Sequence, residues 1–232
     1  MSSFAIKILA MLTMLIDHIG AAFEFSMPYP VYLVCRIIGR IAMPLFCFMI
    51  AEGLFYTRDA KRYMMRLAIF ALVSEVPFDL LFMNELLEFR VQNVGFTLLL
   101  GLSGILLFDS FAAQGHKGAA LAAILAAGAA AHFLRADYGV FGVYYVFIFY
   151  YFRNGKWGKT AALAAGVFLL IWTSPITDWG IAIGSTAAVL AVIPIALYNR
   201  ERGRENRPLR TVFYAFYPAH LFILYALTFV VG

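Results

Sequence analysis

Long apolar stretches follow one another along almost the whole chain, with only short polar segments between them. A helix needs roughly 20 apolar residues to cross about 30 Å of hydrocarbon. The stretches cover approximately residues 4–24, 30–55, 62–83, 94–113, 118–135, 138–152, 158–174, 179–198 and 211–231. This repetition predicts an all-α transmembrane helix bundle of about nine spans, built as a single domain over residues 1–232. Charged residues make up only 13% of the chain, about half of their share in soluble domains, so a largely water-exposed surface is excluded.

The distribution of basic residues predicts the orientation of the bundle. Cytoplasmic loops of membrane proteins carry an excess of Lys and Arg, and an amino terminus in the cytoplasm places fourteen of the eighteen Lys and Arg residues on that side. They are Lys7, Arg58, Lys61, Arg62, Arg66, Lys117, Arg153, Lys156, Lys159, Arg200, Arg202, Arg204, Arg207 and Arg210. We therefore expect an odd number of spans in the bacterial inner membrane, with the carboxyl terminus outside. Contact with anionic lipid explains the net charge of +5, so no nucleic-acid partner is expected.

Ionisable residues inside the apolar stretches are the clearest signal of a functional site. A charged side chain at the centre of a bilayer costs about 2.5–3.5 kcal/mol on insertion scales, so such residues usually face the interior of a bundle. They are Asp17 and His18 in the first stretch, Arg36 and Arg40 in the second, Glu75 and Asp79 in the third, and His220 in the last. Because consecutive spans run in opposite directions, the first six fall in the outer half of the bilayer, near Asn93 and Asp137. We expect these carboxylates, Asn93 and Glu52 to line a polar cavity.

Two interpretations of the buried charges stay open. Arg36 and Arg40 either pair with the carboxylates of the third stretch or take part in chemistry. His18 is suited to proton transfer, because a histidine titrates near neutral pH, and Asp17 could fix its tautomer. His220 is either an interior histidine or the competing catalytic residue. No metal site is expected, since neither an HExxH spacing nor a Cys/His cluster is present.

Arginines on the cytoplasmic side form two clusters. Arg58, Arg62 and Arg66 recur every four residues at the start of the third stretch, so they share one face of a helix. Arg200 and Arg202 lie in a basic loop before the last stretch. Each cluster is either a topological anchor or a binding site for a polyanion, since guanidinium groups bind phosphate oxygens in a bidentate manner. Coenzyme A, with its pyrophosphate and ribose phosphate, is one such ligand.

Six short motifs spread along the chain carry a family resemblance. They are Met14-Leu-Ile-Asp-His-Ile-Gly20, Arg36-Ile-Ile-Gly-Arg-Ile-Ala-Met-Pro44, Ala51-Glu-Gly53, Ser74-Glu-Val-Pro-Phe-Asp79, Asp137-Tyr-Gly-Val-Phe-Gly142 and Phe213-Tyr-Ala-Phe-Tyr-Pro-Ala-His220. Through them the chain resembles, over nearly its whole length, the TraX family, whose named member is the F-pilin acetylase of conjugative transfer. The resemblance implies a membrane acetyltransferase that moves an acetyl group from acetyl-CoA to an amine acceptor, such as the amino terminus of a pilin or peptide, or another small amine or sugar.

The resemblance and the polar residues indicate the same site. His18 would be the general base that deprotonates the acceptor amine, with Asp17 as its partner and His220 as the competitor for the role. Arg36 and Arg40 would stabilise the oxyanion that develops on the thioester carbonyl. The nucleotide of acetyl-CoA would stay at the cytoplasmic arginines, while its thioester arm reaches inward between the helices.

Two alternatives come from other functional classes. A small transporter or channel would show paired half-helices or an inverted repeat, and neither is evident in the sequence. A non-catalytic assembly factor would need no buried histidine. Stabilisation of the protein by coenzyme A distinguishes the acyltransferase from both alternatives.

Overall fold

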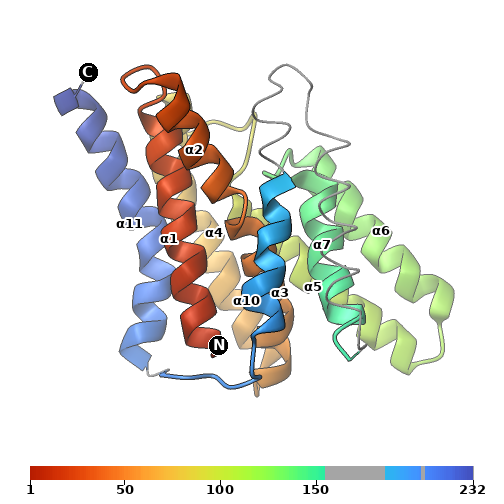
Figure 1. Cartoon of the computed structure of the whole chain (residues 1–232). Coiled ribbons are helices and arrows are strands. Elements are labelled where there is room, and N and C mark those ends of the chain that lie inside the picture. The colour runs from red at the N-terminus through yellow and green to blue at the C-terminus, as the bar shows by residue number, and fades with distance from the viewer. Residues whose placement is uncertain (155–185, 205–206, 232) are drawn as a thin grey trace.

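The computed structural model describes residues 1–154, 186–204 and 207–231, and the regular elements in these ranges are helical (Figure 1). The helices are α1 (Ser3–Ala22), α2 (Tyr29–Gly39), α3 (Ala42–Tyr56), α4 (Ala60–Met83), α5 (Val94–Ala113), α6 (Lys117–Phe133), α7 (Gly139–Tyr151), the 3-10 helix η1 (Thr186–Ala191), α10 (Val192–Ala196) and α11 (Arg207–Val231). Within these ranges, extended backbone pairs only in an isolated bridge between Gln92 and Ala136. The predicted all-α class is therefore confirmed for the described residues.

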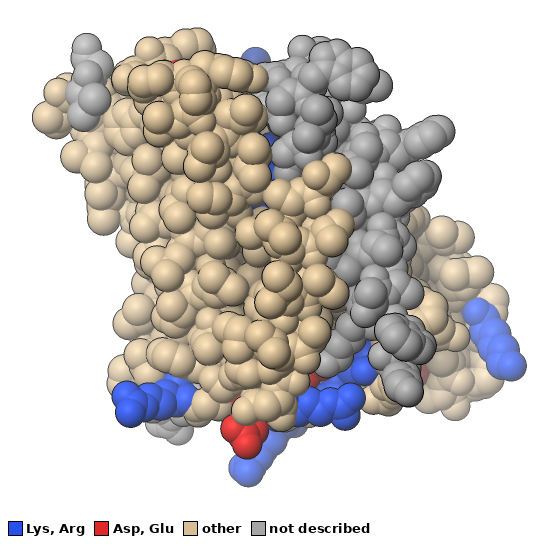
Figure 2. All heavy atoms as spheres, viewed as in Figure 1, with Lys and Arg blue, Asp and Glu red and all other residues tan. Residues whose placement is uncertain are grey.

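The two ends of the chain lie at opposite ends of the bundle (Figure 1). α1 and α11 lie on one side of it, α5, α6 and α7 form the other side, and α3 and α10 lie between them. Lys and Arg side chains gather along the end that holds the amino terminus, whereas the surface above this rim is almost uncharged (Figure 2). A nearly uncharged face above a basic rim is expected of a membrane protein whose basic end faces the cytoplasm.

Among the described residues, four helical stretches are long and apolar enough to cross a membrane, namely α1, α2 together with α3, α5, and α11. α6 and α7 are shorter apolar helices. Of the predicted spans, 158–174 lies outside the described residues, and 179–198 is described only from residue 186 on, where it forms η1 and α10. The chain is a membrane protein with several apolar helices, and the count of nine spans stays a prediction.

The second predicted span, 30–55, is wrong in one respect, because it forms two helices instead of one. α2 ends at Gly39 and α3 begins at Ala42, with Arg40 in the turn between them. Pro44 explains the break, since it has no N–H to donate to the Arg40 carbonyl and its ring would collide with that carbonyl in a continuous helix. Arg40 therefore forms the C-cap of α2, and its backbone N–H still donates to the carbonyl oxygen of Arg36 at 3.3 Å.

Glycines allow α5, α6 and α7 to pack closely. A Cβ atom placed on Gly101 of α5 would lie 3.0 Å from Val146 of α7, and one placed on Gly104 would lie 3.0 Å from Ala127 of α6. Small residues at helix crossings are a common means of packing helices in membranes. These three helices form an apolar unit, so the ionisable residues in the opposite half of the bundle come mainly from α1, α2, α4 and α11.

Candidate active site

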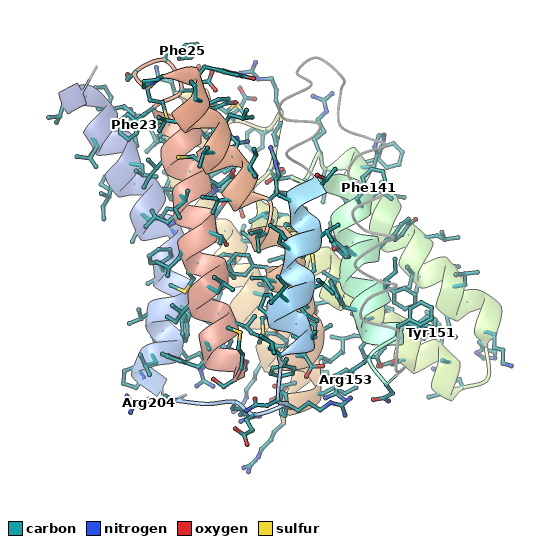
Figure 3. The ribbon with its side chains drawn as sticks, in the orientation of Figure 1. Phe23, Phe25, Phe141, Tyr151, Arg153 and Arg204 are labelled. Carbon is teal, nitrogen blue, oxygen red and sulfur yellow. The ribbon has the colours of Figure 1, made fainter. Side chains whose placement is uncertain are left out.

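Two histidines from opposite ends of the sequence meet inside the bundle. His18 lies on α1 and the buried His220 on α11, and Nδ1 of His18 is 2.7 Å from Nε2 of His220. Their rings are nearly parallel, with an interplanar angle of 8° and centroids 5.0 Å apart. The ring of Tyr217 makes a T-shaped, edge-type contact with each of the two histidine rings. Phe23, five residues after His18, marks the upper end of α1 in Figure 3, so His18 lies away from the basic rim.

The hydrogen bonds of His220 determine the protonation pattern of the pair. Nδ1 of His220 is 2.7 Å from the carbonyl oxygen of Phe216, which can only accept, so this nitrogen carries a hydrogen. Nε2 of a neutral His220 is then an acceptor, and it accepts from the Nδ1–H group of His18. With the tautomers assigned from this network, Nε2 of His18 keeps its lone pair. The pair thus presents one nitrogen that can act as a base.

The carboxylate of Asp17 pairs with Arg36. Nη1 of Arg36 lies 3.1 Å from Oδ2 of Asp17 and 3.4 Å from its carbonyl oxygen. Arg36 is in the last turn of α2, where the partial negative charge of a helix end stabilises a cation. The expectation that Asp17 is the direct partner of His18 is therefore wrong. Adjacent residues point about 100° apart on a helix, and His220 takes the place beside His18.

A close approach of α1 and α2 makes this ion pair possible. A Cβ atom placed on Gly39 would overlap the side chain of Asp17, and one placed on Gly20 would lie 2.7 Å from Cβ of Cys35. Both glycines therefore lie where the two helices touch. Without a side chain at position 39, the face of α2 that carries Arg36 can come directly against Asp17.

Arg40 reaches a different group of residues. It lies beside the side chain of Tyr138, and Asp17 and Asp137 are within reach of its charge. Oδ1 of Asp137 accepts from the backbone N–H of Tyr138 at 3.0 Å. The backbone N–H of Asp137 donates to the carbonyl oxygen of Gln92 at 2.8 Å. Arg40 and Asp137 thus connect the break after α2 with the loops before α5 and α7.

The two carboxylates of α4 are not ion-paired with these arginines. Glu75 accepts from the backbone N–H of Asn93 at 3.1 Å and from its side-chain amide. Asp79 accepts from the backbone N–H of Glu88 at 2.8 Å. Asn93 is fully buried and also caps α5 by accepting from the N–H of Gly95. The ion pairs considered between the second and third predicted spans are therefore wrong, and the carboxylates of α4 instead hold the chain that enters α5.

Several buried polar atoms in this half of the bundle have no hydrogen-bond partner among the described residues. They are Oδ1 of Asp17, Nε of Arg36, Oγ of Ser74, Oε1 of Glu75 and Oδ1 of Asp79. Buried polar groups in folded proteins are almost always satisfied, so such a cluster is expected where a polar substrate or water binds. In the described part of the chain, no three His, Cys, Asp or Glu side chains are arranged to hold a metal ion.

Glu52 belongs to a separate pair at the basic end of the bundle. Its buried carboxylate accepts from Nε and Nη2 of Arg153, at 2.7 and 3.3 Å. The guanidinium of Arg153 also lies 4.0 Å from the ring centroid of Phe55. Figure 3 shows Arg153 at the lower end of the bundle. Glu52 therefore joins α3 to the end of α7, and the expectation that it shares a polar cavity with Glu75 is wrong.

A cavity of about 910 Å³ lies at the same basic end, between α1, α3, α4 and α11. Its basic lining residues are Lys7, Arg58, Arg62, Arg66, Arg202 and Arg210. Four of the five arginines that the sequence predicted as polyanion ligands are thus brought together. Arg200 is not among the lining residues, and its carbonyl oxygen accepts from the hydroxyl of Tyr56 at 2.6 Å. We refer to this space as the basic cavity.

The loop before α11 closes one side of the basic cavity and is held by the start of the chain. The backbone N–H of Ser3 donates to the carbonyl oxygen of Glu201 at 2.8 Å, and the backbone N–H of Phe4 donates to the carbonyl oxygen of Arg202 at 3.1 Å. These bonds place Arg202 next to α1. The two hydrogen bonds therefore bring Arg202 into the same cavity as Lys7, although about 200 positions separate these residues in the sequence.

The inner end of the basic cavity comes close to the histidine pair. Met11 and Phe70 line the cavity, and Met11 is seven residues, or roughly 10 Å along α1, from His18. The ring centroid of Phe70 lies 5.4 Å from that of Tyr217, which lies 5.8 Å from that of His18. Two aromatic rings therefore lie between the cavity and the histidines.

Comparison with known families finds one family that matches nearly the whole chain. The family model described as TraX protein matches residues 2–228, a range that includes both histidines and the whole basic cavity. The chain belongs to the TraX family. A probable fimbrial assembly protein of Dichelobacter nodosus, FimC of serogroup H1, is 28% identical over 240 residues, which cover 96% of this chain and 94% of that protein.

A second relative of this TraX-family chain is an uncharacterized protein of Rickettsia prowazekii (strain Madrid E). It is 34% identical over 96 residues, which cover 41% of this chain and 33% of that protein. No solved structure matches the chain. The family membership thus rests on the sequence comparisons, and the geometry above shows how the TraX motifs are arranged in space.

The six motifs that carry the resemblance do not all gather at one place. Those that contain His18 and His220 meet at the histidine pair, and the motif that begins with Arg36 lies beside them. The motif around Glu52 lies at the other end of the bundle. Lys7 is not singled out as a ligand by the sequence, because a basic residue at a membrane surface looks the same whether it lines a cavity or anchors a helix.

Proposed function

We propose that this TraX-family protein is an acetyltransferase of the bacterial inner membrane, which moves an acetyl group from acetyl-CoA to an amine. The main support is the hydrogen bond from His18 to His220, which leaves Nε2 of His18 as a base. The amine nitrogen attacks the thioester carbonyl and forms the C–N bond, while Nε2 takes a proton from that nitrogen. The C–S bond then breaks, and the proton passes to the leaving thiolate of coenzyme A. A general base of this kind contributes about 10²–10⁴-fold to the rate.

The basic cavity supports coenzyme A as the donor. Coenzyme A carries phosphates at one end and the reactive thioester on a long arm at the other. Basic side chains around the cavity, such as Arg58, Arg62 and Arg210, match the phosphates. Apolar residues such as Met11 and Phe46 also line it and suit a neutral arm. In this proposal the rings of Phe70 and Tyr217 move aside, so that the thioester reaches His18.

Arg36 is the residue best suited to stabilise the oxyanion. Its ion pair with Asp17 holds the guanidinium near the histidines, and its buried Nε has no hydrogen-bond partner among the described residues. A positioned cation in a water-poor site stabilises developing negative charge more strongly than it would in water. Arg40 adds a second positive charge from the side of Tyr138.

The acceptor is proposed to enter from the outer side, opposite the basic cavity. The partnerless carboxylate oxygens of Asp17, Glu75 and Asp79 lie in that half of the bundle and would attract a cationic amine before it loses its proton. The similar protein of Dichelobacter nodosus is named a probable fimbrial assembly protein. That name favours a pilin or a related peptide as the acceptor, with its amino terminus as the acetylated group.

Coenzyme A binding tests the donor half of this proposal. Purified protein in detergent should unfold at a higher temperature when coenzyme A is added. Charge reversal by Arg62→Glu or Arg210→Glu should remove this shift, while Lys117→Glu on α6, outside the cavity, should keep it. Because Arg62 also pairs with Asp59 at 3.0 Å, each variant is first compared without the ligand. Absence of any shift in the unsubstituted protein would favour a non-catalytic assembly factor or a transporter.

Transfer of a labelled acetyl group tests the chemical half. The protein is incubated with acetyl-CoA labelled in its acetyl group and with peptides that have a free or a blocked amino terminus. Labelling of the free peptide alone is the expected result. A protein that binds coenzyme A but releases only free acetate would contradict transfer to an amine.

A further inference from the structure

A second hollow lies on the surface between α4 and α11, with a volume of about 590 Å³. Its lining includes Ile69, Val73 and Pro77 of α4, and Ala215, Ala219 and Phe222 of α11. We call it the α4–α11 groove. Its polar lining residues, Arg66, Thr211 and Tyr214, all lie toward the cytoplasmic end of the two helices, so the groove is apolar along most of its length and charged at one end.

Side-chain size explains why the groove exists. Ala215 and Ala219 lie one turn apart on α11 and leave space that a larger side chain would fill. At the edges of the groove, Ile69, Val73 and Phe222 are each more than half exposed. In a membrane protein, exposed apolar side chains at this depth face lipid acyl chains instead of water. The natural occupant of the groove is therefore apolar and comes from the bilayer.

The charged end of the groove narrows the choice of occupant. Nε of Arg66 is buried and has no hydrogen-bond partner among the described residues. Leaving a buried donor of a charged group unpaired is unfavourable, so an anionic ligand atom beside it would be favoured. An arginine fork matches the oxygens of a phosphate. Basic pockets between membrane helices on the cytoplasmic side are typical sites for anionic headgroups.

The dimensions agree with one acyl chain of one leaflet. From Arg66 to Pro77 the groove follows eleven residues of α4, roughly 16 Å at 1.5 Å per residue, about half of the 30 Å hydrocarbon thickness. Dividing the volume of about 590 Å³ by this length gives a mean cross-section of roughly 40 Å². A helix 10 Å wide has about twice this cross-section, so the groove is too narrow for a helix and suits a thinner occupant. We propose that the α4–α11 groove binds an anionic phospholipid of the cytoplasmic leaflet, with one acyl chain in the groove and its phosphate at Arg66.

Native mass spectrometry of the detergent-solubilised protein tests this site. The protein is titrated with phosphatidylglycerol, and bound lipid is counted in the unsubstituted chain and in two variants, Ala219→Leu and Arg66→Gln. Ala219 is exposed, so leucine should fill the groove without disturbing the fold. Loss of a charge-assisted hydrogen bond of about 1.5–3 kcal/mol predicts at least about tenfold weaker binding in Arg66→Gln, and Ala219→Leu should lose a similar factor.

Matched controls separate this site from general lipid adhesion. Ala126→Leu adds the same bulk to an exposed position of α6, and Lys117→Gln removes a charge outside the groove; both should bind phosphatidylglycerol like the unsubstituted protein. Phosphatidylcholine should bind at least tenfold more weakly, and inorganic phosphate should not displace the lipid. Equal binding of phosphatidylcholine, displacement by phosphate, unchanged affinity in Ala219→Leu, or occupation by an added hydrophobic helical peptide in place of lipid would overturn the proposal.

Discussion

The ring of His18 lies parallel to that of His220 and 2.7 Å from it between the facing nitrogens, although 202 residues separate the two in the chain. The pair joins the first helix to the last. Nδ1 of His220 donates to the carbonyl oxygen of Phe216. The hydrogen bonds therefore run in one direction, from His18 through His220 to this backbone carbonyl. The two histidines are therefore not equivalent, and replacing each should have a different effect.

Removal of His18 should abolish acetyl transfer while leaving coenzyme A binding intact, because the basic cavity is formed by other residues. A lost general base predicts a decrease in rate of about 10²–10⁴-fold for His18→Ala. His220→Gln should be milder than His220→Ala, since a glutamine oxygen can still accept from Nδ1–H of His18. Rates are measured with labelled acetyl-CoA after each variant has shown an unchanged thermal shift with coenzyme A. Near-normal turnover in His18→Ala together with an inactive His220→Ala would reverse the assigned roles.

A reporter that is active only in the cytosol should be inactive when fused after Gly232. The reason is the concentration of basic residues at the end of the bundle opposite the carboxyl terminus (Figure 2), which the positive-inside rule assigns to the cytoplasm. The same reporter inserted at Gly115, in the loop between α5 and α6, serves as the positive control. Strong activity at Gly232 would require an even number of spans.

Loss of the ion pair between Glu52 and Arg153 should destabilise the protein without affecting its chemistry directly. Arg153→Met leaves the carboxylate of Glu52 buried and uncompensated, and breaking such a pair costs about 3–5 kcal/mol. The double variant Glu52→Gln with Arg153→Met removes both charges and should recover most of this loss. Unfolding of the purified proteins in one detergent measures the difference. Equal stability of Arg153→Met and the unsubstituted protein would mean that water reaches Glu52.

Addition of a single methyl group at Gly39 should disrupt the ion pair between Asp17 and Arg36. The new Cβ atom would overlap Asp17, so α1 and α2 must separate or the aspartate must turn away. Overpacking of this kind typically costs about 1–3 kcal/mol. Acetyl transfer by Gly39→Ala should fall more than its coenzyme A affinity, because the strain lies beside the histidines and not in the basic cavity. Gly118→Ala, at a site with open space around it, is the control that should leave both unchanged.

The apolar pattern predicted the positions of α1, α5 and α11 to within a few residues, because a membrane span must be long and largely uncharged. The break before Ala42 was missed, although Gly39 and Pro44 signal it, since hydropathy alone runs through the interruption. Proline was in any case an ambiguous signal here: α4 continues through Pro77 and α11 through Pro218.

The partners of the buried polar residues could not be derived from sequence, because they depend on how each helix is rotated against its neighbours. His18 stands out in the sequence as an ionisable residue in an apolar stretch, but the side chain of its sequence neighbour, Asp17, pairs with Arg36 of α2. The true neighbour of His18 comes from α11. Similarly, the spacing of Arg58, Arg62 and Arg66 indicated a shared face, while the contribution of Lys7 to the same cavity needed the fold.

The lack of space for a Cβ atom at Gly39, beside Asp17, also gives a criterion for classifying proteins similar to this one. Many membrane proteins share a series of apolar helices, so hydropathy alone is a weak guide to shared chemistry. In a chain with any side chain at the position of Gly39, α1 and α2 must separate or the aspartate must turn away, so the arginine would have to be held in another way. A glycine aligned with Gly39, together with histidines aligned with His18 and His220, is therefore a stricter criterion for inheriting this site than overall identity.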